Sequence, residues 1–268
     1  MATNSKLLRG VVPPVCTPFT ADYEVDEKSL RRLVNHLIDG GVHGLFVLGS
    51  TSEVAYLTDK RRADVIRIAI DETAGRVPVV AGAIDMTTLR VNEHVRAAVA
   101  AGIDGIVITA PFYARTHPEE IALHFRLVKE ECGDVPLYAY DIPVAVNGVK
   151  LETATVLKLA KEGVIQGLKD SSDLDAGIRA VVLGAQEHIG QHRHRLAPFD
   201  DTDHVLDRTE DLFTGGCEFH SFRSGLYPDV IAIVEPVDMG RTPEKPLNSV
   251  PWTLYAAGTS RARPVHSL

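Results

Sequence analysis

From residue 10 to about residue 187, short apolar runs alternate with longer segments of helical period. The runs are rich in β-branched residues and lack polar alternation, so each is expected to be a strand buried on both faces. The longer segments repeat apolar positions every three or four residues, as the buried side of an amphipathic helix does. The predicted strands cover residues 10–16, 44–49, 78–83, 105–109, 136–140 and 164–168, and the predicted helices cover residues 26–41, 58–75, 87–102, 117–133, 151–163 and 173–188.

These elements form six strand–helix units that repeat roughly every 27 to 34 residues. Such a repeat is typical of a (β/α)8 barrel or of a doubly wound open sheet. A nucleotide-binding open sheet carries a glycine-rich phosphate loop after its first strand, whereas CTPFTAD follows the first strand here. We therefore expect an α/β fold, a (β/α)8 TIM barrel, with six βα units in residues 1–187.

The rhythm is lost after about residue 187. Residues 188–268 contain many prolines and histidines, and helical period is hard to find in them. Residues 211–216 and 228–236 could be strands seven and eight, but about 11 residues between them are too few for a crossover helix. We expect an irregular C-terminal region that either supplies these two strands or leaves the barrel incomplete.

Composition narrows the functional classes. The formal net charge is −8 and no run of Lys or Arg stands out, so nucleic acid is not an expected partner. No apolar stretch reaches about 18 residues and the N-terminus lacks the apolar core of a signal peptide, so neither a membrane span nor export is expected. Three distant cysteines, Cys16, Cys132 and Cys217, indicate a reducing, cytoplasmic setting without disulfides or a zinc site.

The candidate chemistry lies at the predicted strand ends, where barrels place their active sites. These ends carry one amine, Lys169, the tyrosines Tyr113 and Tyr140, and the hydroxyls of Ser50 and Thr51. They carry no histidine and no obvious carboxylate pair, which argues against metal-dependent hydrolysis and glycosidase chemistry. We expect neither a metal nor any other cofactor.

Tyr140 and Lys169 are one βα repeat apart, so their strands should be neighbours at a backbone distance of about 5 Å. A buried lysine is costly unless it reaches water, finds a partner or gives up its proton. A neutral amine beside a tyrosine hydroxyl is what Schiff-base formation with a ketone requires. The hydroxyls and backbone N–H groups of Ser50 and Thr51 could hold a carboxylate.

Four motifs resemble the dihydrodipicolinate synthase/N-acetylneuraminate lyase family. They are GVVPPVCTPFTADYEVDEKSLRRLVNHLIDGGVHGLFVLGSTSE, PFY, YDIP and GLKDSS, in the order and spacing of the family, and the resemblance covers about residues 8 to 187. It implies a (β/α)8 barrel, usually tetrameric, whose lysine forms a Schiff base with pyruvate or a related 2-oxo acid. The bound 2-oxo acid is then condensed with, or cleaved from, an aldehyde.

By this resemblance, Lys169 corresponds to the Schiff-base lysine and Tyr140 to the phenol that shuttles protons. Ser50 and Thr51 correspond to the pair that binds the pyruvate carboxylate and links the tyrosines, and Tyr113 to the tyrosine that enters the neighbouring subunit's site. The resemblance implies a 2-oxo acid and an aldehyde as small-molecule substrates. It also implies a homo-oligomer, tetramer or dimer, if the barrel closes.

This sequence differs from the family pattern at three places that bear on its function. Ser52 replaces the usual glycine, which would strain the turn if its φ were positive. The arginine that holds the aldehyde carboxylate in dihydrodipicolinate synthases is absent from YDIPVAVNG, which favours an uncharged or sugar-derived aldehyde. The tail matches only faintly, at Phe213-Thr214-Gly215. The alternative is therefore a truncated, non-catalytic paralogue that is partly folded or serves as an interaction partner.

Overall fold

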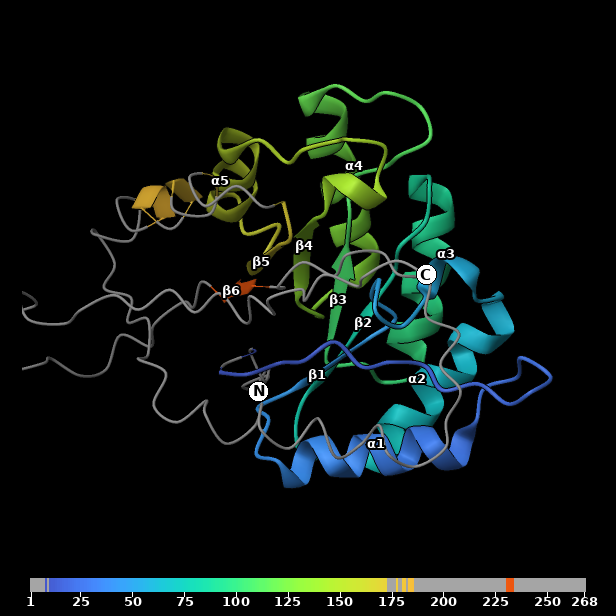
Figure 1. Ribbon diagram of the computed structural model, residues 1–268. Coiled ribbons are helices and arrows are strands. Elements are labelled where there is room, and N and C mark those ends of the chain that lie inside the picture. The colour runs from blue at the N-terminus through green and yellow to red at the C-terminus, as the bar shows by residue number, and fades with distance from the viewer. Residues whose placement is uncertain are drawn as a thin grey trace, which may run out of the picture.

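The computed structural model describes residue 8, residues 10–172 and six positions of a following helix (177, 180, 181 and 183–185), and it adds the backbone of Val230–Ile233. Strands and helices alternate through the long segment (Figure 1). The strands are β1 (Leu45–Val47), β2 (Val79–Gly82), β3 (Gly105–Ile108), β4 (Leu137–Asp141) and β5 (Gly167–Asp170). The helices are α1 (Glu27–Asp39), α2 (Asp59–Thr73), α3 (Thr88–Ala100), α4 (Pro118–Cys132) and α5 (Thr153–Lys161), with short 3-10 helices η1 (Val54–Tyr56) and η2 (Pro143–Ala145).

The sheet is a curled half-barrel of parallel strands. β1 to β5 pair in the order of the chain, and each neighbouring pair is parallel. The helices α1 to α5 follow one another around the outer side of this curve (Figure 1). The expected barrel-type α/β fold is therefore confirmed for the part of the chain that carries the βα repeats.

Helix starts are set by capping side chains that the sequence places before each apolar segment. Asp26 accepts a hydrogen bond from the backbone N–H of Ser29 at the start of α1, and Thr58 and Thr87 act in the same way for α2 and α3. α4 starts with a capping box at His117 and has Pro118 at its first position. These caps place the observed helix starts within one or two residues of the predicted ones.

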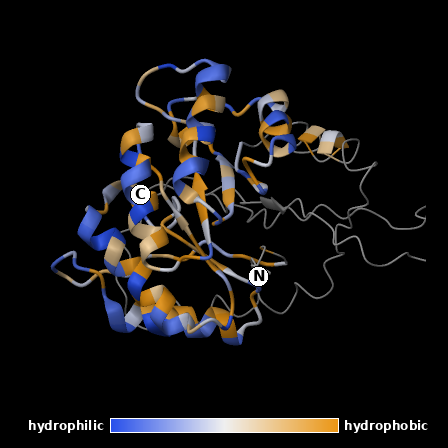
Figure 2. Ribbon diagram, turned by 180° about the vertical axis from the view of Figure 1, so that it is seen from behind, coloured by the Kyte–Doolittle hydropathy of each residue, from blue (hydrophilic) through white to orange (hydrophobic). Residues whose placement is uncertain are grey.

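Two apolar layers cover the two faces of the sheet. Phe46, Val80 and Val107 lie on the inner face with Tyr138 and Tyr140, while the residues next to them in each strand pack outward against the helices. Figure 2 shows strands that are mostly hydrophobic, and helices on which hydrophobic and hydrophilic residues alternate. Both strand faces are thus buried, as the absence of polar alternation predicted.

The predicted first strand, residues 10–16, is present only as a bridge. The segment runs beside β1, with a parallel bridge between Pro14 and Phe46 and backbone bonds from Val15 N to Phe46 O and from Phe46 N to Pro13 O. Proline has no backbone N–H, so two consecutive prolines interrupt the ladder at this point. The segment nevertheless occupies the place of a barrel strand at the edge of β1.

Beyond residue 187 the structure describes one short strand. β6 (Val230–Ile233) lies inside the predicted run 228–236, but it pairs antiparallel with β5. A barrel strand would run parallel to its neighbour, so this pairing differs from that expected of strand seven or eight. The run 211–216 lies outside the described residues, and the domain boundary at residue 187 stays a prediction. Among the described helices none is long and apolar enough to cross a membrane.

Candidate functional site

The ends of β4 and β5 bring Tyr140 and Lys169 together. The two residues are register partners in neighbouring parallel strands, as their spacing predicted. The Lys169 Nζ lies 3.9 Å from the centroid of the Tyr140 ring and donates a hydrogen bond to the Ser171 Oγ at 3.1 Å. Both side chains are buried, with 1% of Tyr140 and 3% of Lys169 exposed. An amine and a phenol thus share one desolvated space.

The loop after β1 reaches the same space. The Ser50 Oγ lies 3.1 Å from the Tyr140 hydroxyl, in a hydrogen bond in which either oxygen can donate. Phe46 of β1 packs edge-on against the Tyr140 ring, and its own centroid lies 5.9 Å from the Lys169 Nζ. We call Lys169, Tyr140 and Ser50 the lysine–tyrosine site.

Ser52 supports this loop from behind, and the strain that a positive φ would have caused does not arise. The positive φ values after β1 fall on Leu48, at 58°, and on Glu53, at 57°. The Ser52 Oγ donates a hydrogen bond to the Val15 carbonyl, and Thr17 Oγ1 donates to the Ser52 carbonyl at 2.9 Å. The serine therefore ties the loop that carries Ser50 to the segment that runs beside β1.

The two other predicted site residues lie at the same end of the sheet. Thr51 is half-buried and follows Ser50 in the loop. Tyr113 follows β3, has a φ of 85° and is 83% exposed, so its ring is outside the lysine–tyrosine site of this chain. Its role in a neighbouring subunit's site stays a prediction.

Sequence reasoning missed a second group of charges at these strand ends. Asp141 and Asp170 are register partners and follow Tyr140 and Lys169, so they project from the opposite face of the sheet. Lys150 forms an ion pair with Asp141, and its Nζ lies 3.9 Å from the Asp170 Oδ2. Burial raises the pKa of Asp141, although the ion pair acts in the opposite direction. We call Asp141, Lys150 and Asp170 the charged cluster.

The sequence did hold one indication of this cluster: the two aspartates stand at the same place at the ends of two consecutive predicted strands, one residue after Tyr140 and Lys169. Asp170 Oδ1 accepts a hydrogen bond from Ser172 N at 2.8 Å, which is a common role of an aspartate at the start of a turn. Lys150 is the second residue after the stretch YDIPVAVNG, with Val149 between them. No periodicity indicates that its ammonium returns to Asp141, because that depends on the path of the loop.

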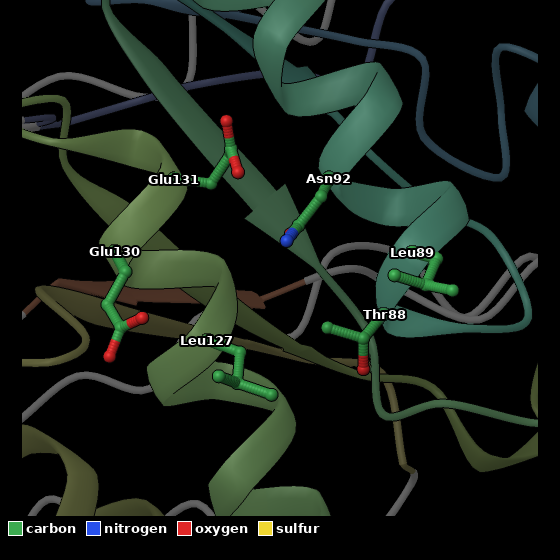
Figure 3. A pocket seen from close by; sticks show the side chains of 6 residues that line it. All are labelled: Thr88, Leu89, Asn92, Leu127, Glu130 and Glu131. Carbon is green, nitrogen blue, oxygen red and sulfur yellow. The ribbon is translucent and has the colours of Figure 1, made fainter.

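A separate hollow of about 410 Å³ lies on the outer surface between α3 and α4 (Figure 3). Its lining residues are Thr88, Leu89, Asn92, Leu127, Glu130 and Glu131. None of them belongs to the lysine–tyrosine site. Within residues 10–172 and the other described positions, no group of three His, Cys, Asp or Glu side chains could hold a metal ion.

The fold and the site together define a class of protein: a barrel-type α/β protein with a buried amine at the carboxyl end of one strand and a phenol at the end of the next. The family follows from the sequence. Residues 7–190 match the Dihydrodipicolinate synthetase family, which is more than half of the chain. The chain belongs to this family.

Two relatives illustrate that the proteins similar to this chain carry different names. The 4-hydroxy-tetrahydrodipicolinate synthase of Methanothermobacter thermautotrophicus is 38% identical over 169 residues, which are 63% of this chain and 59% of that protein. The Escherichia coli protein named "Putative 2-dehydro-3-deoxy-D-gluconate aldolase YagE" is 34% identical over 228 residues, which are 85% of this chain and 73% of that protein. The chain thus spans about three fifths of the length of the synthase it matches.

Solved structures share the fold. The crystal structure of YagE in complex with pyruvate gives a TM-score of 0.64 at 34% identity, over 69% of this chain and 60% of that chain. A crystal structure of dihydrodipicolinate synthase (dapA) gives a TM-score of 0.63 at 31% identity, over 66% of this chain and 61% of that chain.

Proposed function

We propose that the chain is a Schiff-base-forming lyase or aldolase that acts on pyruvate or a related 2-oxo acid and on an aldehyde. The observation that carries this proposal is the position of the Lys169 amine beside Tyr140, whose hydroxyl contacts Ser50. The relatives support it through their names, which describe a synthase of this family and an aldolase, and one related structure contains pyruvate.

Each residue of the site then has a chemical task. The Lys169 amine attacks the ketone carbon, a C–N bond forms, and the ketone oxygen leaves as water. The Tyr140 hydroxyl donates and accepts the protons of these steps. Its hydrogen bond to Ser50 lets the proton pass to the Ser50 oxygen and back. Ser50 and Thr51 hold the carboxylate of the 2-oxo acid. The resulting iminium withdraws electrons, so the adjacent carbon can lose a proton and form, or break, the bond to the aldehyde carbon.

The aldehyde partner is proposed to be uncharged, such as a hydroxyaldehyde. The stretch YDIPVAVNG contains no cation, and Lys150 just after it pairs with Asp141 and Asp170 on the opposite face of the sheet. Binding of an anionic aldehyde in a desolvated pocket that lacks a cation would be less favourable by several kcal/mol. A higher kcat/KM for glyceraldehyde than for aspartate semialdehyde, both with pyruvate, is the expected result; the reverse order would overturn the assignment of the aldehyde class.

A homo-oligomer is proposed as the active form. Four large apolar side chains follow β1, β2 and β3 at one end of the sheet and are exposed: Tyr56, Met86, Leu89 and Tyr113. Exposed apolar residues that gather in one region mark interaction surfaces. Tyr113 would then complete the site of the neighbouring subunit.

The decisive experiment is reductive trapping. Incubation with pyruvate and borohydride should add one reduced pyruvate per folded chain, and peptide mapping should place it on Lys169. Lys169→Arg should abolish the adduct, while Lys161→Arg, at an exposed position of α5, should retain it. A folded wild-type chain without adduct at Lys169 would overturn the proposed function.

The alternative of a truncated, non-catalytic paralogue is not favoured by the comparisons. It would require that the lysine–tyrosine site has no substrate, although its amine and phenol lie together at adjacent strand ends. A monodisperse oligomer with a cooperative melt would count against this alternative.

A further inference from the structure

The charged cluster connects three parts of the chain on the face of the sheet opposite to the lysine–tyrosine site. Asp141 ends β4, Asp170 ends β5, and Lys150 lies between η2 and α5. The Asp141 Oδ1 also accepts a hydrogen bond from the backbone N–H of Leu151 at 3.1 Å. The segment 142–151, which leaves β4 directly after the site, is thus bound back to the strand end where it began.

The charges of the cluster do not cancel. Two buried carboxylates face one ammonium, which is itself partly exposed. Among the described residues, Lys150 and Asp170 are the charged groups that act on Asp141. Lys169 projects from the opposite face of β5, and Glu152 at the start of α5 is exposed. Lys150 is therefore the cation that keeps two adjacent carboxylates compatible with burial.

We propose that Lys150 is a positioning residue, which clamps the segment 142–151 onto the ends of β4 and β5 and thereby fixes Tyr140 and Lys169 relative to each other. The positioning role rests on the proposed function. Tyr140 and Lys169 each precede a clamped aspartate by one residue, so a shift of either strand end moves the phenol relative to the amine. A displacement of about 1 Å in a reacting group can cost up to a hundredfold in rate.

The role of the cation makes a specific prediction for Lys150→Met. Without the ammonium, burial raises the pKa of Asp141 with less opposition, so this carboxyl takes up a proton more readily. At acidic pH the neutral Asp141 carboxyl keeps its hydrogen bond from the Leu151 N–H, and the clamp stays closed. As the pH rises this proton is lost, the carboxylates repel each other, and the clamp opens. Lys150→Arg retains a cation and should behave as the wild type.

Hydrogen exchange tests the clamp without any substrate. In Lys150→Met, amides of residues 142–151 should lose protection by roughly tenfold at a pH of about 8.5 and retain it at about 6.5, after correction for the intrinsic exchange rate. Protection in β1 to β3 should not change, and Lys161→Met in α5 serves as the matched control. Wild-type protection of 142–151 in Lys150→Met at the higher pH would overturn the clamp.

Trapping of pyruvate on Lys169 tests the positioning. With cyanoborohydride as reductant, Lys150→Met should form the adduct at roughly a tenth of the wild-type rate or less at the higher pH and close to the wild-type rate at the lower pH. Rescue by Lys150→Arg would separate positioning from a loss of folding. An open clamp with a wild-type rate of adduct formation would overturn the positioning role. No adduct in the wild type would overturn the proposed function and the positioning role together, and hydrogen exchange would still decide whether the clamp exists.

Discussion

His124 lies on the inner side of α4, 2% exposed, with its Nδ1 2.9 Å from the Thr88 Oγ1 of α3. Burial lowers the pKa of His124 to about 4. Between pH 6.5 and about 4 the unfolded chain binds a proton that the folded chain does not, so this histidine makes stability fall as the pH drops through that window. The loss should reach up to about 3 kcal/mol.

Urea unfolding at several pH values checks this prediction. The free energy of unfolding should decrease from pH 7 toward pH 4, and His124→Gln should flatten the decrease while it lowers the stability at pH 7. His117→Gln, which changes an exposed histidine and weakens the cap of α4, is the matched control. An unchanged slope in His124→Gln would contradict the assignment.

Asp141 affects the pH dependence of stability in the opposite direction to His124. Burial raises its pKa, so the folded chain binds the proton more readily than the unfolded chain, and the contribution to stability is lost as the pH rises through the folded pKa. Asp141→Asn removes the ionised group and retains an oxygen for the Leu151 N–H. The melting temperature should therefore stay equal or rise by a few degrees near pH 7.5, and the gain should vanish near pH 4. A fall of several degrees near pH 7.5 would show that the ion pair with Lys150 outweighs the cost of burial.

At the residue scale, the sequence predicted that Tyr140 and Lys169 lie together, because the register of β4 and β5 determines their contact. Tyr140 and Lys169 are one βα repeat apart, and parallel neighbours with short connections leave little freedom in their alignment. Lys150 could not be assigned in the same way. Its contact with Asp141 depends on how η2 and the following turn fold, and hydrophobic periodicity carries no information about a turn.

At the scale of elements, the close approach of β1 and β2 depends on a glycine. A Cβ built on Gly82 would lie 2.0 Å from the Leu48 carbonyl oxygen, which belongs to the backbone and cannot rotate away. Gly82→Ala should push the two strands apart and destabilise the chain by about 1–3 kcal/mol.

The matched control is Gly40→Ala at the end of α1, where the nearest atom to a new Cβ is 3.2 Å away and φ is −71°. Thermal melts of both variants check the prediction. If Gly82→Ala melted as high as Gly40→Ala, the close approach of β1 and β2 would not be a constraint on stability.

Helices were easier to predict than strands because their ends carry chemical markers. Asp26, Thr58 and Thr87 fixed the starts of three helices through their caps. The first predicted strand had the right apolar composition, yet Pro13 and Pro14 reduced it to a bridge. Apolar composition indicates burial, whereas a ladder also needs N–H groups.

At the scale of the whole molecule, the exposed apolar residues at one end of the sheet predict self-association. Tyr113→Asp places a charge on the most exposed of these side chains and should shift the chain toward smaller species. Sedimentation equilibrium measures this shift. The control is Leu123→Asp on α4, an exposed leucine outside that region. If Tyr113→Asp sedimented as the wild type does, the surface around Tyr113 would not be the contact between copies.

The half-barrel followed from the repeat of strands and helices, but the direction of β6 did not. The run around Val230–Ile233 is apolar in either direction, and a strand at a sheet edge can pair parallel or antiparallel with the same side chains. Direction is set by the path of the chain before the strand, which the apolar pattern does not describe.

The alternation of side chains at the ends of β4 and β5 has a consequence for how the molecule can change. Substrate chemistry is proposed for one face of these strand ends, and the attachment of the loop 142–151 is on the other, one residue further along each strand. Libraries that keep the charged cluster and vary the other residues of the loop 142–151 can therefore change the surroundings of the aldehyde and leave the amine and the phenol in place. New substrate preferences would be accessible by steps that each keep the ability to form the Schiff base.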